Sequence, residues 1–121
     1  RIPWRIAWDY YWYQSAESQQ ILTAMANFIS TATANNPAPL PTTSYNYSTG
    51  ALSTGQTAGE HYIGMYCLMG LGVNPTWHNA CFDYFTQKVQ AYRAVGYTGT
   101  YFKEILTIMY STLMNGGFVK I

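Results

Sequence analysis

The chain has 121 residues, a common size for one domain. Asp, Glu, Lys and Arg make up only 9% of it, against about 25% in an average soluble domain, while hydrophobic residues reach 49%. A formal net charge of +1 without a basic run argues against a nucleic-acid partner, and no apolar stretch approaches the roughly 20 residues that a membrane span requires.

This scarcity of charge limits what can cover the surface. Uncharged polar residues and the 12 tyrosines must face water almost unaided, or further protein must cover part of the surface. The many tyrosines and tryptophans favour a secreted protein that handles neutral polar ligands. Arg1 stands where an initiator methionine would, which favours a processed or fragmentary chain.

Hydrophobic periodicity predicts two helices in the first third of the chain. Pro3 suits the first turn of a helix over residues 3–14, and Ser15 can cap a second helix over residues 16–33. The apolar positions of the second helix keep the 3.6-residue period. The first helix carries an aromatic stripe made of Trp4, Ala7, Trp8, Tyr11 and Trp12.

A long connection follows the second helix. Three prolines within residues 35–44 prevent that helix from continuing. The next segment, YNYSTGALSTG at residues 45–55, alternates weakly and fits either a small hairpin or an irregular loop.

Three more helices are predicted in the rest of the chain. They cover residues 57–71, with Gly72 placed to end the helix, residues 75–93, with Asn74 as the N-cap, and residues 99–114. The sequence therefore predicts an all-α fold of five helices, joined by short turns and one long proline-rich connection.

The two cysteines, Cys67 and Cys81, lie 14 positions apart. Neither belongs to a CxxC motif or has a histidine at ligand spacing, so no metal site is predicted. We favour two buried thiols, with a disulfide between them as the alternative.

Motifs that identify common enzymes are missing from the sequence. It contains no GxSxG, P-loop, dinucleotide-binding or HExxH pattern, and no cofactor is implied. His61 and His78 are single histidines, which we interpret as structural or surface residues. The carboxylates are isolated as well, and those of Asp83 and Glu104 are expected to face solvent.

Charged residues near the start of the chain form a pattern of their own. Arg1, Arg5 and Asp9 are spaced by four and therefore share one helix face. They fit either a local ion-pair network or a polar strip along a cleft. In the second interpretation, Trp4 and its aromatic neighbours supply flat faces for a sugar ring.

Three segments of the chain together resemble one enzyme family. RIPWRIAWDYYWYQ is similar to RxPWRIAxDYxWYG, with Gln14 in place of the final glycine, and this match is the most specific. YNYSTGALSTGQTAGEHYIGMYCLMGLG resembles a G-Y-x-x-x-G loop and its following helix, and TYFKEILTIMYSTLMNGGF resembles YYxDxLxLLSLLxLSGxF. These patterns belong to glycoside hydrolase family 8, inverting endo-acting glucanases, chitosanases and xylanases built as an (α/α)6 barrel.

The resemblance implies that the catalytic residues lie outside this chain. In the family, the general base is an Asp three residues before the Arg that matches Arg1, and the general acid is a Glu near the start of the enzyme. Residues 1–121 would therefore be the C-terminal portion of a single (α/α)6 catalytic domain, a partial barrel of about five helices that is inactive alone. Arg1 would lie one helical turn from the base and favour its charged form.

Roles for other residues follow from the same resemblance. Tyr101 matches a tyrosine near the substrate cleft, whereas Phe102 replaces its hydroxyl-bearing neighbour. Trp4 is the second candidate for sugar binding, because of its place in the aromatic stripe. Arg5 and Asp9 are expected to form a buried polar pair that holds their helix in the barrel.

The implied function is that of a secreted hydrolase that cleaves β-1,4-linked polysaccharide. Cellulose or β-glucan is the favoured substrate, with chitosan and xylan as alternatives. The expected partners are the polysaccharide and either the missing N-terminal part of the barrel or another copy of the chain. The alternative function is a non-catalytic helical module that associates with itself.

Overall fold

The computed structural model describes residues 2–40, 48–49, 58–96 and 99–118. This part of the chain forms five α-helices and no strand, which confirms the predicted all-α class. Apart from a turn at residues 48–49, the predicted hairpin or loop at residues 45–55 lies outside the described residues. The helices are α1 (Ile2–Tyr13), α2 (Ala16–Thr33), α3 (Glu60–Leu68), α4 (Pro75–Ala94) and α5 (Tyr101–Met114).

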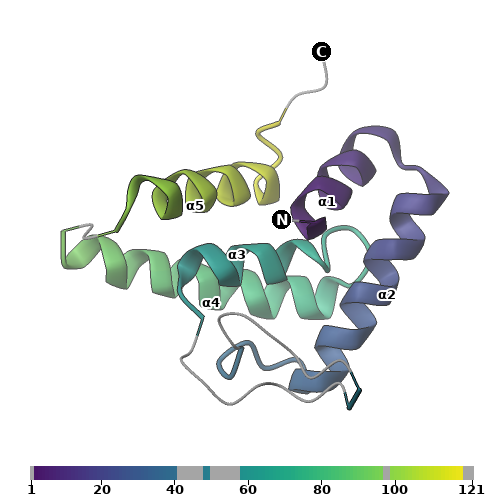
Figure 1. The fold of residues 1–121 in the computed structure, drawn as a ribbon, viewed down its shortest axis with the longest axis horizontal. Helices are drawn as coiled ribbons and strands as arrows, with labels where there is room; N and C mark the ends of the chain where they lie inside the picture. Colours follow the sequence, from purple (N-terminus) through teal and green to yellow (C-terminus); the bar gives the residue numbers. More distant parts are fainter. Residues whose placement is uncertain (1, 41–47, 50–57, 97–98, 119–121) are drawn as a thin grey trace.

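A sharp turn separates α1 from α2. Gln14 adopts a positive φ of 53°, and its backbone N–H donates to the carbonyl of Tyr10 at 2.9 Å, which closes α1. The hydroxyl of Ser15 then accepts a hydrogen bond from the N–H of Ser18 at 3.2 Å and caps α2 as predicted. The two helices form an angled pair at one end of the molecule, beside the layer made by α3, α4 and α5 (Figure 1).

The third helix, α3, ends earlier than predicted, at Leu68 rather than at residue 71. A turn over residues 69–73 follows it. At Gly70, a Cβ atom would lie 2.9 Å from Cδ1 of Trp77 and 3.0 Å from the carbonyl oxygen of Asn74. Only glycine lets the chain pass this close to the start of α4, so the packing between the two helices sets this boundary.

Two hydrophobic clusters hold the helices together. Met65 and Met114 pack against both, so the core is continuous. The first cluster centres on α3 and α4 and consists of Ile29, Leu40, Ala58, Ile63, Tyr66, Cys67, Trp77, Cys81 and Phe85. The second lies where α1 meets α2, α3 and α5 and consists of Ala7, Tyr10, Leu22, Leu68, Tyr110 and Leu113.

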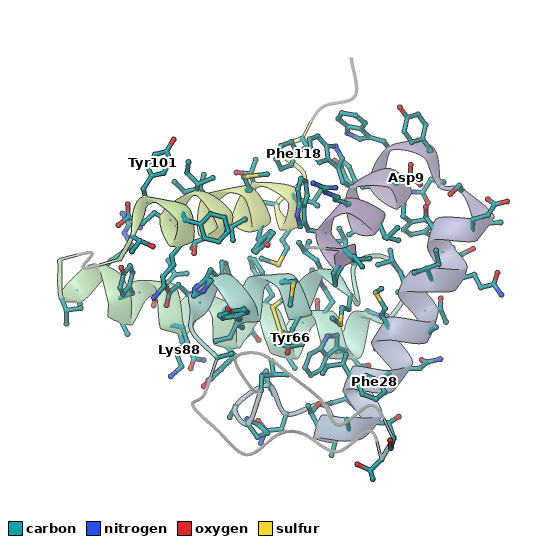
Figure 2. All side chains as sticks on the ribbon, viewed as in Figure 1. Asp9, Phe28, Tyr66, Lys88, Tyr101 and Phe118 are labelled. Atoms are coloured by element: carbon teal, nitrogen blue, oxygen red, sulfur yellow. A yellow bond between two sulfur atoms is a disulfide. The ribbon has the colours of Figure 1, made fainter. Side chains whose placement is uncertain are left out.

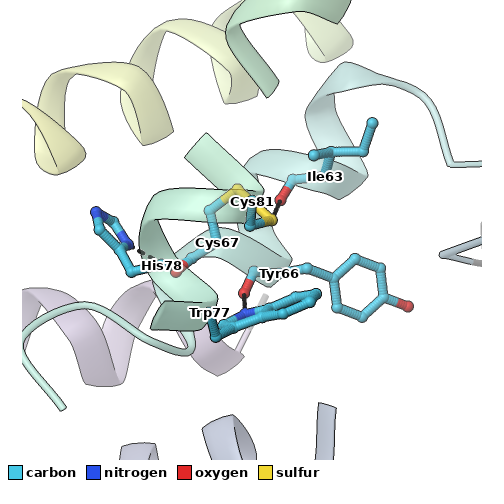
Figure 3. Close-up of a disulfide and its surroundings, with 6 residues drawn as sticks. All are labelled: Ile63, Tyr66, Cys67, Trp77, His78 and Cys81. Atoms are coloured by element: carbon cyan, nitrogen blue, oxygen red, sulfur yellow. Dashed lines mark hydrogen bonds between the residues drawn. A yellow bond between two sulfur atoms is a disulfide. The ribbon is translucent and has the colours of Figure 1, made fainter. Parts of the chain in front are cut away.

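A disulfide between Cys67 and Cys81 joins α3 to α4 inside the first cluster (Figure 3). The favoured prediction of two free thiols is therefore wrong. The two helices run antiparallel and bring the Cα atoms within 5.1 Å, a normal distance for a disulfide. Beside it, Nε1 of Trp77 donates to the carbonyl of Tyr66 at 2.9 Å. Spacing along the chain could not show that these two helix faces meet.

Candidate functional site

Three tryptophan rings lie one after another along α1. Trp4 and Trp8 stack with their centroids 5.3 Å apart and their planes 28° from parallel. Trp8 and Trp12 meet edge to face at 5.0 Å. Residues spaced by four share one helix face, and both arrangements are favourable for aromatic pairs. Of the stripe predicted from the sequence, the three tryptophans form a contiguous row, whereas Ala7 is fully buried in the second cluster.

The segment after α5 closes one side of this surface (Figure 2). The ring of Phe118 lies 4.6 Å from that of Trp8, and the carbonyl of Phe118 accepts a hydrogen bond from Nε1 of Trp12 at 3.0 Å. The hydroxyl of Tyr11 donates to the carbonyl of Gly116 at 3.2 Å. Two hydrogen bonds and a ring contact therefore fix α1 to residues 116–118.

A shallow, wide-open depression of about 340 Å³ lies along one face of α1. Its charged groups are the exposed guanidinium of Arg5, whose central carbon lies 5.8 Å from the Trp4 ring centroid, and the carboxylate of Asp9. The distance from Arg5 to Trp4 is typical of a cation–π contact. We call this site the α1 groove, and its lining residues are Trp4, Arg5, Trp8, Asp9, Trp12 and Tyr13.

The carboxylate of Asp9 bonds to the start of α2. Oδ2 of Asp9 accepts hydrogen bonds from the hydroxyls of Ser18 and, at 3.3 Å, Ser15. Within the described residues, Arg5 forms no ion pair with Asp9. The expected buried polar pair is therefore not formed, because the turn at Gln14 folds α2 back and brings two serine hydroxyls to the carboxylate.

The two predicted sugar contacts lie far apart. Tyr101 is the first residue of α5 and is 79% exposed, whereas Trp4 belongs to α1, which packs at the other end of α5. Figure 2 shows Tyr101 and Phe118 at opposite ends of this helix. The 14 residues of α5 rise about 1.5 Å each, so about 20 Å separates its ends. Arg1 lies outside the described residues.

The chemistry available in the α1 groove favours binding over bond cleavage. Of the described residues that line it, only Asp9 carries a carboxylate, whereas glycosidases typically use a pair of carboxyl groups. The groove offers flat aromatic faces and a planar hydrogen-bond donor. Across the described segments, no three His, Cys, Asp or Glu side chains gather as a metal ion would require, and no described helix is long and apolar enough to span a membrane.

Phe118 and Tyr13 were missed by the sequence analysis of this site. Phe118 follows directly after the NGG that ends the last helix. An aromatic residue so soon after the end of a helix was the one feature of the sequence that could have indicated its packing against α1. Tyr13 lies outside the stripe predicted from spacing, yet it lines the groove.

The helix pair α1 and α2, with the segment after α5 packed on α1, thus defines the candidate site. No family model, curated protein or solved structure matches the chain.

Proposed function

We propose that the chain is the C-terminal part of an inverting, endo-acting glycoside hydrolase that cleaves β-1,4-linked polysaccharide. Cellulose or β-glucan is the first substrate, with chitosan and xylan as alternatives. The observation that carries the proposal is the α1 groove, because it lies on the segment with the most specific resemblance to glycoside hydrolase family 8. In this proposal the general acid and base lie outside the chain, so residues 1–121 bind sugar without cleaving it.

The side chains of the α1 groove suit a pyranose ring. Such a ring has faces made of C–H groups, which pack on flat aromatic surfaces, and an equator of hydroxyls, which need hydrogen-bond partners. Trp4 and Trp12 offer the aromatic surfaces, and the exposed guanidinium of Arg5 offers several donors in one plane. The groove runs along the helix, as a binding site for an extended chain of sugars requires.

The backbone at Gln14 supports the resemblance. The family pattern RxPWRIAxDYxWYG has glycine at this position, and Gln14 has a φ of 53°, in the left-handed region that favours glycine. Nε2 of Gln14 donates to the carbonyl of Tyr10 at 2.8 Å, which helps to hold a non-glycine residue in this conformation. The turn therefore has the backbone conformation that the glycine of the pattern would fit.

Exposed apolar side chains support a place in a larger barrel. Ile21 and Phe28 on α2 are 42% and 44% exposed, and Phe102 and Ile108 on α5 are 52% and 64% exposed. Large exposed apolar surfaces usually mark interaction sites. In the proposed enzyme, the N-terminal part of the barrel covers these side chains.

A non-catalytic helical module that associates with itself is the second candidate. The same exposed side chains on α2 and α5 favour it, because another copy of the chain could cover them. The two candidates differ in what covers the exposed apolar side chains. In the hydrolase it is the rest of the same barrel, and in the self-associating module it is an identical subunit.

Sugar binding by residues 1–121 tests the α1 groove. Titration with cellohexaose, xylohexaose and chitosan hexamer, followed by tryptophan fluorescence, should give a saturable change with at least one of them. Trp4→Ala should weaken that binding by about two- to tenfold, because an aromatic contact is lost. Phe28→Ala, which removes an exposed aromatic ring outside the groove, is the matched control and should bind normally. Equal affinities for the Trp4→Ala variant and the unmodified chain would contradict a role for the groove.

Hydrolysis tests the catalytic part of the proposal. The natural protein that contains this chain should release reducing ends from carboxymethylcellulose, xylan or chitosan, and NMR should show that the new anomeric centre is inverted. Residues 1–121 alone should release none. Hydrolysis by residues 1–121, or inactivity of the natural protein on all three polysaccharides, would overturn it.

A further inference from the structure

The last helix, α5, ends in a turn with Asn115 as its C-cap. The backbone N–H of Gly116 donates to the carbonyl of Leu113 at 3.0 Å, and that of Gly117 donates to the carbonyl of Thr112 at 2.8 Å. This pair of hydrogen bonds is a Schellman motif, in which the residue after the C-cap has a positive φ. Gly116 has a φ of 71°, which glycine adopts without strain.

The same turn positions the residues that hold α1. We call residues 116–118 the brace. The carbonyl of Gly116 accepts a hydrogen bond from Tyr11, and Phe118 contacts Trp8 and Trp12. Two of these contacts are made by backbone carbonyls, so they depend on the path of the main chain. A change in the backbone at the C-cap of α5 therefore reaches the α1 groove.

Asn115 is the only asparagine in the sequence that precedes a glycine. Asparagine is chemically labile, because the backbone nitrogen of the next residue can attack its side-chain carbonyl carbon, Cγ. That attack forms a bond from Cγ to the backbone nitrogen and breaks the bond from Cγ to Nδ2. Ammonia leaves with the proton of the backbone amide, and a cyclic succinimide remains. A following residue without a Cβ atom hinders this ring closure least.

Water then opens the succinimide at one of its two carbonyl carbons. Opening at Cγ gives aspartate at position 115 in an ordinary main chain. Opening at the backbone carbonyl carbon gives isoaspartate, in which the main chain runs through Cβ and is longer by one atom. Both products carry a negative charge that Asn115 lacks.

Neither product fits the end of α5 as well as Asn115 does. Nδ2 of Asn115 donates a hydrogen bond to the carbonyl of Ser111 at 2.8 Å, and a carboxylate cannot donate it. A negative charge at the C-terminus of a helix also opposes the helix dipole. In isoaspartate, the extra main-chain atom moves Gly116 and Gly117 out of register with the carbonyls of α5. One product therefore weakens the turn, and the other breaks it.

The folded turn slows this reaction but does not prevent it. The side chain of Asn115 is exposed, but the N–H of the attacking nitrogen, on Gly116, is bonded to Leu113. The last turn of α5 must therefore open first, and opening near a helix end costs little free energy. The contacts of Phe118 with α1 oppose that opening, so they should limit the rate.

We propose that Asn115 is a site of spontaneous deamidation, and that its modification releases the brace from α1. Water is the only other reactant. The attachment of the brace then has a limited chemical lifetime, whichever ligand the α1 groove binds. The proposal does not depend on sugar binding or hydrolysis, because every measurement that tests it is made without a polysaccharide.

Incubation of the 121-residue chain at mildly alkaline pH tests the chemistry. Peptide mapping by mass spectrometry should show that Asn115 exchanges NH for O, and a protein isoaspartate methyltransferase should label the same peptide. Asn79 is the internal control, because it is also exposed but precedes an alanine, and it should react many-fold more slowly. Asn115→Gln can close only a larger, less favourable ring and should stay unlabelled.

The indole N–H signals in NMR spectra test the release of the brace. In the deamidated chain, the signal of Trp12 should shift, because its hydrogen bond to the carbonyl of Phe118 is lost. Trp77 is the control, since its N–H donates to the carbonyl of Tyr66 inside the first cluster and should not be affected.

Phe118→Ala tests whether the brace limits the reaction. It keeps Asn115 and Gly116, and it should increase the rate of deamidation several-fold because α5 opens more readily at its end. Phe28→Ala removes an exposed ring from α2 and should leave the rate unchanged.

Three outcomes would overturn the proposal. They are deamidation of Asn115 that is no faster than that of Asn79, a deamidated chain in which the Trp12 signal does not move, and equal rates for Phe118→Ala and Phe28→Ala. Circular dichroism shows whether each variant folds. If Phe118→Ala does not fold, the peptide map and the indole signals of the chain without substitutions decide the question.

Discussion

His61 couples folding to pH. Burial lowers its pKa below the ordinary value of 6.5, so the unfolded chain takes up this proton more readily than the folded chain does. The neutral imidazole of His61 therefore makes its full contribution to the free energy of unfolding above about pH 6.5. That contribution is lost as the pH falls toward the lowered pKa. We expect the free energy of unfolding, measured with urea, to decrease between pH 7.5 and 5.5.

The matched variant for this prediction is His61→Leu, which cannot take up the proton. Ordinary carboxylates titrate below this window, and the part of the pH dependence that His61 causes should disappear in the variant. An unchanged slope between pH 7.5 and 5.5 in His61→Leu would show that other groups are responsible.

Among single residues, the sequence predicted those whose role depends on local spacing. Trp4 and Trp8 share a face because four residues make about one helical turn. The partners of Asp9 could not be predicted, because they depend on how the turn at Gln14 directs α2. His61 was interpreted as a structural or surface residue, and its enclosure beside α5 depends on a contact between helices that periodicity does not encode.

The disulfide stabilises the contact between α3 and α4. It closes a loop with a sequence separation of 14, and closing a loop of about 15 residues is worth about 3 kcal/mol in the chain-entropy account. Both cysteines are fully buried, so a reductant should reach them when the chain opens. We expect unfolding under reducing conditions to require about 3 kcal/mol less than under oxidising conditions, as measured by urea denaturation with and without a phosphine reductant.

A double variant, Cys67→Ala with Cys81→Ala, is the control for that measurement. It should be less stable than the oxidised chain and should not respond to the reductant. If the reductant destabilised the double variant as much as the unmodified chain, its effect could not be assigned to the disulfide.

Helix boundaries were predictable where a local signal sets them. Ser15 and Asn74 cap α2 and α4 as expected, since each side chain accepts a hydrogen bond from its own first turn. The end of α3 was not predictable, because the close approach of Gly70 to Trp77 is a tertiary contact. The disulfide was only the alternative prediction for the same reason, because the cysteines meet through a contact between two helices.

The whole molecule carries apolar side chains that its own helices do not cover. Both functional candidates predict that residues 1–121 alone do not stay monomeric, at a mass of 13.7 kDa, in size-exclusion chromatography with light scattering. Replacing Phe102 and Ile108 with serine should shift the chain toward the monomer. Replacing Gln20, an exposed polar residue on α2, with serine should not.

The form of the association separates the two candidates. Aggregation that is relieved by the N-terminal part of the natural protein supports the hydrolase barrel. A discrete, stable oligomer supports the self-associating module. A monodisperse monomer with uncovered apolar faces would contradict both.

The attachment of α1 to residues 116–118 makes the groove a property of the folded chain and not of one helix. Phe118 packs on Trp8, and its carbonyl holds the indole of Trp12 in place. A helix of 12 residues is marginal on its own in water. A synthetic peptide with the sequence of α1 would therefore keep the tryptophans and lose their arrangement. A graft of this surface onto another scaffold would also have to include Phe118, from the far end of the chain.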